Sequence, residues 1–202
     1  MNIKKYIKEA HENAVEKGFY TCQECGGDGL RLYNPLDPMC GNCEGTGIDP
    51  NKNIGELLMI IVADLGKAFT LWNDKISEYH LKNTKCAGLL YLEFKEKLAD
   101  VFIRLFDLAG YMIEPENYDI AVDNIDNFMV DLYEADNFGE WMFRYIKYNI
   151  SEIADGDDAN YVPAGAIGRA IAALMRFCDK NNIPIEKHIE AKISYNKTRS
   201  IE

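Results

Sequence analysis

One stretch decides the predicted fold of this chain: Glu93-Phe-Lys-Glu-Lys-Leu-Ala-Asp-Val-Phe-Ile-Arg-Leu-Phe-Asp-Leu-Ala-Gly110. Its apolar residues recur at the three- and four-residue spacing of an amphipathic helix: Leu98, Val101, Phe102, Leu105, Phe106 and Ala109. We expect Gly110 to end this helix, because glycine is common just beyond helix C-termini. Asp100 lies at the edge of the apolar face, where a carboxylate must be hydrogen-bonded, ion-paired or bound to a metal. The residue pattern alone leaves open a flank of salt bridges or a metal site.

The composition limits the classes of protein to which the chain can belong. The 202 residues are 48% hydrophobic, so the chain can bury a core as one domain, or as one domain plus a small module. Its formal net charge of −11 argues against a generic nucleic-acid or acidic-membrane binder. No apolar run approaches the roughly 20 residues of a membrane span, and no apolar signal core accompanies the N-terminal lysines. We therefore predict a cytoplasmic protein without a membrane segment.

Two copies of a cysteine motif give the most specific signal in the sequence. Cys22-Gln-Glu-Cys25-Gly-Gly-Asp-Gly29 and Cys40-Gly-Asn-Cys43-Glu-Gly-Thr-Gly47 both read CxxCxGxG. Each CxxC pair lets two thiolates converge, and the glycines permit the tight turns that this requires. Four sulfur ligands predict a closed tetrahedral zinc site, with no position left for catalysis. The alternative, two disulfides, needs an oxidising compartment that nothing in the sequence supports.

The paired motif resembles half of the cysteine-rich region of DnaJ proteins, in which two such repeats bind each zinc ion. The chain has no J-domain signature, so the resemblance does not imply co-chaperone activity. A structural staple, for a segment too small to have its own core, is the simpler role. A peptide- or nucleic-acid-reading role is the alternative.

The remaining periodicity predicts an all-α chain in three parts. These are an N-terminal helix at residues 1–18, the zinc-knuckle module at 19–50 and a helical domain at 51–202. A long helix is expected from Ile54 to about Tyr79, followed by a polar loop and the helix that contains Asp100. The resulting helical hairpin places Asp64 and Asp100 on facing helices.

Two segments of the helical domain contain motifs of a known family: Lys97-Leu-Ala-Asp-Val-Phe-Ile-Arg-Leu-Phe-Asp-Leu-Ala-Gly110, and Asn182-Ile-Pro-Ile-Glu-Lys-His-Ile-Glu-Ala-Lys-Ile-Ser-Tyr-Asn-Lys-Thr-Arg199. They resemble the MazG-like, all-α nucleoside triphosphate pyrophosphatase superfamily. The resemblance extends over residues 54–113 and 164–200. It implies a helical bundle that hydrolyses a nucleoside triphosphate to the monophosphate and pyrophosphate with the help of Mg²⁺.

The resemblance also implies site residues. The catalytic candidates are Asp64 and Asp100, which are also the magnesium ligands if magnesium binding is retained, and Glu96, which lies one residue from a carboxylate position of the family. On the last predicted helix, residues at i, i+4 and i+7 share one face and are implied to bind the nucleotide: Lys192, Asn196 and Arg199. A basic last turn favoured by the helix dipole is the alternative explanation of that cluster.

The sequence departs from the family at the metal site. Family members place four carboxylates around Mg²⁺, and this chain has Asp64, Lys67, Lys97 and Asp100 at those positions. Magnesium requires oxygen ligands, which an ammonium group cannot supply. The expected function is therefore a pyrophosphohydrolase with weakened or lost activity. The alternative is a catalytically inactive protein on the same fold that binds a nucleotide or a protein partner.

A weak internal repeat adds a prediction about assembly. The segment Ile54-Gly-Glu-Leu57 resembles Phe138-Gly-Glu-Trp141, within two possible repeats at residues 54–113 and 138–200. A duplication would let one chain form both halves of a bundle that single-copy relatives build as dimers. Both a monomer and a homodimer stay open, and chance similarity between amphipathic helices is the alternative explanation.

Overall fold

The computed structural model describes residues 1–30, 39–76, 84–127, 137–155 and 161–199. Within these ranges the ordered elements are helices, which confirms the predicted all-α class. The α-helices are α1 (Ile3–Glu16), α2 (Ile54–Ile76), α4 (Thr84–Met112), α5 (Tyr118–Asn127), α6 (Phe138–Trp141), α7 (Lys147–Asp155), α8 (Tyr161–Lys180) and α9 (Ile185–Thr198). A 3₁₀ turn lies at Pro115–Asn117 and a π-helical turn at Met142–Ile146. No helix in these ranges is long and apolar enough to cross a membrane.

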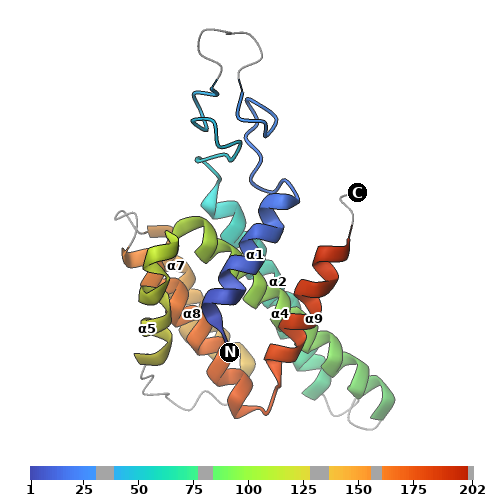
Figure 1. Cartoon of the computed structure of the whole chain (residues 1–202). Coiled ribbons are helices and arrows are strands. Elements are labelled where there is room, and N and C mark those ends of the chain that lie inside the picture. Colours follow the sequence, from blue (N-terminus) through green and yellow to red (C-terminus); the bar gives the residue numbers. More distant parts are fainter. Residues whose placement is uncertain (31–38, 77–83, 128–136, 156–160, 200–202) are drawn as a thin grey trace.

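Asparagine side chains begin the first two helices at the predicted places. Asn2 Oδ1 accepts a hydrogen bond from Lys5 N at 3.1 Å, and Asn53 Oδ1 accepts one from Glu56 N at 3.3 Å. Such caps satisfy backbone donors that a helix N-terminus leaves free. The cysteine-containing segment between α1 and α2 projects from one end of the helical bundle (Figure 1).

Helix α4 is the central element of the bundle. It packs against α1, α2, α8 and α9, so its sides are covered by elements from both ends of the chain. The apolar residues that predicted this helix are all fully buried: Leu98, Val101, Phe102, Leu105, Phe106 and Ala109. Because α4 needs partners on several sides, helices from both ends of the chain, α1 and α9, pack against it (Figure 1).

Gly110 has a different role from the one expected. Helix α4 continues past it to Met112, so Gly110 is not the stop. A Cβ atom at this position would lie 2.4 Å from Cβ of His11 on α1, closer than real Cβ contacts allow. The glycine is therefore needed for the close approach of α1 to α4, and the helix ends where the chain turns into Pro115–Asn117.

The second half of the chain repeats a pairing seen in the first. On the α2–α4 hairpin, Arg104 Nε donates to Oδ2 of Asp64 at 2.8 Å. On the α7–α8 hairpin, Arg169 Nε donates to Oδ1 of buried Asn149 at 2.9 Å, and Arg169 also pairs with Glu152. Each hairpin is also covered by a further helix in the same way, because α1 packs on α4 and α5 packs on α8.

The π-helical turn accounts for a shift of one residue between the two halves. Phe138 follows Ile54 by 84 positions, whereas Asn149 follows Asp64 by 85. The turn at Met142–Ile146 lies between the two matches, and a π-turn accommodates one extra residue in a helix. The duplication stays a prediction, and a superposition of residues 54–113 on residues 138–200 would test it.

The contact at Gly110 can be tested by two alanine substitutions. Gly110→Ala should lower the free energy of unfolding by about 1–3 kcal/mol, because the new methyl group overlaps His11. Gly66→Ala is the matched control, since a Cβ atom there meets nothing within 4 Å and alanine favours a helix by about 1 kcal/mol. Chemical denaturation of both variants measures the difference. Equal stability changes in the two variants would contradict the proposed close contact.

Candidate functional site

The four cysteines of the CxxCxGxG motifs converge on one point. The Sγ atoms of Cys22 and Cys40 are 3.9 Å apart, those of Cys25 and Cys43 are 3.7 Å apart, and all four lie within 4.8 Å of one another. Zinc–sulfur bonds of about 2.3 Å in a tetrahedron require sulfur atoms about 3.8 Å apart. A disulfide would need about 2.05 Å. The cluster could therefore hold a zinc ion with closed Cys₄ coordination.

The backbone around the cysteines has matching turns in the two motifs. Cys22 N donates to the carbonyl oxygen of Gly47 at 2.9 Å, and Cys40 N donates to that of Gly29 at 2.8 Å. Gly29 and Gly47 both have positive φ, at 73° and 74°. A Cβ atom at either position would lie 2.2 Å from a backbone oxygen of the other motif. Glycine is thus required twice, which explains the repeated last glycine of the motif.

Hydrogen bonds from protein donors reach two of the four sulfur atoms, while burial raises the pKa of a third cysteine, Cys25, to about 11. Asn42 Nδ2 donates to Cys22 Sγ at 3.4 Å, and Gly47 N donates to Cys43 Sγ at 3.3 Å. The hydrogen bond from Asn42 is the main cause that lowers the pKa of Cys22 to about 7. Donors of this kind stabilise thiolates, which are the form that binds metal.

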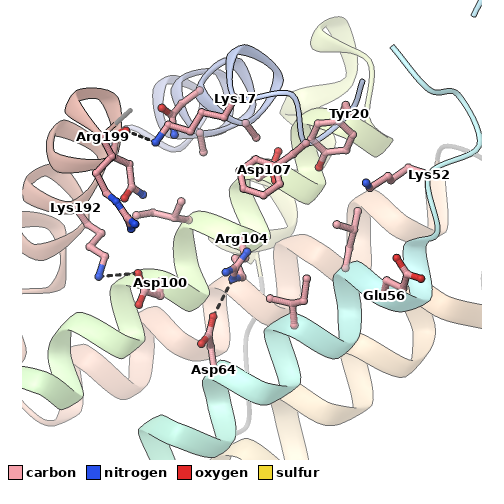
Figure 2. Close-up of a pocket in the computed structure, with 18 of the residues that line it drawn as sticks. Lys17, Tyr20, Lys52, Glu56, Asp64, Asp100, Arg104, Asp107, Lys192 and Arg199 are labelled. Carbon is pink, nitrogen blue, oxygen red and sulfur yellow. Dashed lines mark hydrogen bonds and ion pairs between the residues drawn. The ribbon is translucent and has the colours of Figure 1, made fainter. Parts of the chain in front are cut away.

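A second site is a cavity of about 800 Å³ between α1, α2, α4 and α9 (Figure 2). Its floor includes four residues of α4 that share one side of the helix: Lys97, Asp100, Arg104 and Asp107. Seven lysine and arginine side chains but only four carboxylates line it, an excess of three positive charges. This cavity is cationic within a chain whose net charge is −11.

Two of the aspartates in the cavity, Asp64 and Asp100, have a cation close to each carboxylate oxygen. Asp64 is 5% exposed, and its Oδ2 accepts from Arg104 Nε at 2.8 Å while its Oδ1 lies 3.5 Å from Lys67 Nζ. Asp100 Oδ2 accepts from Lys97 Nζ at 2.9 Å, and its Oδ1 lies 3.0 Å from Lys192 Nζ. Figure 2 shows the pairs to Arg104 and Lys192. Each buried or half-buried carboxylate is thus neutralised by two positive groups.

The hydrogen bond to Asp100 also acts on Lys97. This bond is the main cause that raises the pKa of Lys97, with smaller contributions from the charges of Asp100 and Asp64, while partial burial opposes the rise. Lys97 therefore stays cationic at neutral pH. A lysine that is charged and bound to Asp100 cannot act as a metal ligand.

The structure brings together most of the predicted site residues. The cavity is lined by Asp64 of α2, Asp100 of α4, Lys192 and Asn196 of α9, and Arg199, which caps the C-terminus of α9. Glu96 is exposed on α4 and is not among the residues that line the cavity, so the structure does not bring it to the two aspartates.

The sequence analysis missed other cavity residues, among them Arg104 and Lys17. Arg104 lies four residues after Asp100 on one helix, so helical spacing could have placed it in the cavity. Lys17 follows the end of α1, and its ammonium group donates to the backbone oxygen of Asn196 across the cavity rim. No local signal predicts that contact between residues so distant in sequence.

Comparisons with protein families, with curated proteins and with solved structures found no match to this chain. Among the residues that the structure describes, the four cysteines are also the only group of three or more cysteine, histidine or acidic side chains close enough to hold a metal. The cysteine cluster and the cationic cavity are therefore the two candidate functional sites of the described residues.

Metal analysis tests the cysteine cluster. The full chain purified without chelator should contain about one zinc ion, and Cys43→Ser should lose it because three sulfurs no longer close the tetrahedron. Hydrogen exchange should then accelerate at residues 19–30 and 39–49, while the helices, which have a separate core, keep their protection. Cys178→Ser is the control, because Cys178 is buried in the helical core and should leave the zinc content unchanged. A zinc-free protein with four free thiols and an intact fold would refute the assignment.

Proposed function

We propose that this protein binds a nucleotide in the cationic cavity and does not hydrolyse it by a magnesium mechanism. The observation that carries the proposal is the double pairing of Asp64 and Asp100, in which all four carboxylate oxygens face a lysine or arginine. The resemblance to MazG-like pyrophosphatases supports a nucleotide as the ligand and an enzyme-like frame that has lost its metal.

Electrostatics disfavours magnesium at the two aspartates. Four cationic groups surround two carboxylates, so the cluster has a formal charge of about +2 before any ligand enters. A divalent cation would have to displace these groups and would still find only two acidic side chains, whereas Mg²⁺ prefers an octahedron of oxygens. The same four groups can instead meet the negative charge that Mg²⁺ neutralises in the family.

The cavity suits a phosphorylated ligand of nucleotide size. Its volume of about 800 Å³ lies within the ordinary range of small-molecule sites. Lys97 and Lys192 are ion-paired with Asp100, one on each carboxylate oxygen. Each ammonium group has three N–H donors, so donors remain for phosphate oxygens. Arg199 lines the same end of the cavity. A local positive field in an acidic protein also attracts anions and repels dications.

The zinc ion has a structural part in this proposal. A Cys₄ site has no open position for substrate, so the ion would hold residues 19–30 and 39–49 in place rather than take part in chemistry. A reducing compartment such as the cytoplasm, which keeps the four thiols available for zinc, belongs to the same proposal.

Loss of hydrolysis is tested by turnover. The unmodified chain should release no pyrophosphate from any common nucleoside or deoxynucleoside triphosphate, with Mg²⁺ or with Mn²⁺, because its aspartates are already paired. The double substitution Lys67→Glu plus Lys97→Glu restores four carboxylates and is measured alongside. Metal-dependent turnover by the unmodified chain that Asp100→Ala abolishes would show an ordinary enzyme of the family.

Binding is tested by calorimetry with a matched pair of lysines on α9. Lys192→Met should weaken nucleoside triphosphate binding about tenfold, since it removes one charge-assisted hydrogen bond. Lys187→Met is the control, because Lys187 is exposed on the same helix and lies outside the cavity. Binding should be equally strong without Mg²⁺ and should weaken as salt is raised. Affinity that requires Mg²⁺, or equal losses in the two variants, would overturn the proposal.

A further inference from the structure

The cavity has a second wall that the aspartate cluster does not explain. Phe19 and Tyr20 lie just before Thr21 and the first cysteine motif, and they line the cavity together with Lys52, which follows the second motif. Tyr20 and Lys52 lie on the side of the cavity opposite Lys192 and Arg199 (Figure 2). The cysteine-containing segment therefore reaches the cavity at the end far from the cations of α9.

This wall is fixed to the helices by aromatic contacts. The Tyr20 ring stacks on that of Tyr111 of α4, with centroids 4.9 Å apart and planes 17° apart. His11 packs its edge on Tyr20 at 5.0 Å, and its Nδ1 lies 3.0 Å from Oδ1 of Asp107. The Tyr111 hydroxyl accepts from Lys52 N at 3.1 Å, so both sides of the wall meet at one tyrosine.

Two backbone hydrogen bonds connect the same wall to the cysteine cluster. Asp49 N donates to the carbonyl oxygen of Tyr20 at 2.8 Å, and Cys22 N donates to that of Gly47 at 2.9 Å. The two chain segments that enter and leave the module are thus paired between the wall and the thiols. A metal that fixes Cys22 and Cys43 therefore also fixes the backbone that presents Phe19 and Tyr20.

The chemistry of the wall differs from that of the cationic end. Phe19 is 60% exposed, although it is a large aromatic side chain, and apolar Leu57 and Ile60 of α2 line the cavity with it. Tyr20 itself is buried beside Asp107, and burial is the main cause that raises the pKa of its hydroxyl above the usual range. The exposed aromatic face of Phe19 is therefore the part of the wall that suits a flat ring, because every nucleobase can stack on an aromatic side chain.

We propose that the zinc module forms the base-recognition wall of the cavity, so that bound zinc sets the affinity for nucleotides. This rests on the proposed nucleotide-binding function, in which the phosphates occupy the cationic end. The nucleobase stacks on Phe19, and the bound ion adds to the order of the Phe19–Tyr20 backbone through the paired segments that enter and leave the module. A bare phosphate chain, which does not reach the wall, binds equally well with or without zinc.

The experiment compares inorganic triphosphate with the nucleoside triphosphates by calorimetry on the full chain. Phe19→Ala should keep its zinc and weaken the best-bound nucleoside triphosphate about tenfold, the range expected for one lost stack, with triphosphate affinity unchanged. Cys43→Ser should produce the same selective loss without touching the wall. Phe143→Ala is the control, because this side chain is 66% exposed and lies outside the cavity.

A second readout measures the coupling in reverse. Linkage requires that a ligand whose affinity depends on zinc also retains zinc. In a competition at equilibrium the chain should therefore lose less zinc to a chelator in the presence of the nucleoside triphosphate, and inorganic triphosphate should leave the competition unchanged.

The outcomes separate the two proposals. Triphosphate binding with no gain from a nucleobase, or nucleotide affinity unchanged in Phe19→Ala and Cys43→Ser, would overturn the base-recognition wall and leave the cationic site standing. An unmodified chain that binds neither ligand would overturn both proposals.

Discussion

The burial of α4 between Phe94 and Ala109 is the constraint on which the rest of the structure depends. Over this part the helix buries its apolar side chains almost completely, and a helix of that kind is stable only when partners cover it. Helices from the first, second and last parts of the chain meet that need. One side of α4 is polar, from Lys97 to Asp107, and the cavity lies where this polar side meets its neighbours. The position of the site thus follows from the one side of α4 that apolar packing does not cover.

Features that depend on local sequence could be predicted. The CxxCxGxG spacing fixes the ligand geometry within each motif, and helical periodicity located α4 because its apolar spacing is unambiguous. The predicted helical hairpin already placed Asp64 and Asp100 on facing helices, whereas only the family resemblance suggested that Lys192 of a third helix joins them. That resemblance stays a proposal, whereas the proximity of these side chains is a property of the structure.

Features that depend on rotation or on distant contacts could not be predicted. Glu96 is one residue from Lys97, but one residue turns a helix by about 100°, which is enough to direct its side chain to solvent. Gly110 resembled a helix stop, yet its value lies in the space it leaves for His11, about 100 positions earlier in the chain. The pairing of Asp64 with Arg104 likewise needs the register of α2 on α4, which composition does not specify.

The closeness of Tyr20 and Asp49 has a consequence for how this chain could have been assembled. Their backbones are joined by a hydrogen bond of 2.8 Å, so the segment between them starts and finishes at nearly the same point. A segment with adjoining ends can be added to a loop, or removed from it, while α1 and α2 stay where they are. The cysteine module therefore has the geometry of an insertion into a helical ancestor, and an engineer could graft another compact unit at the same junction.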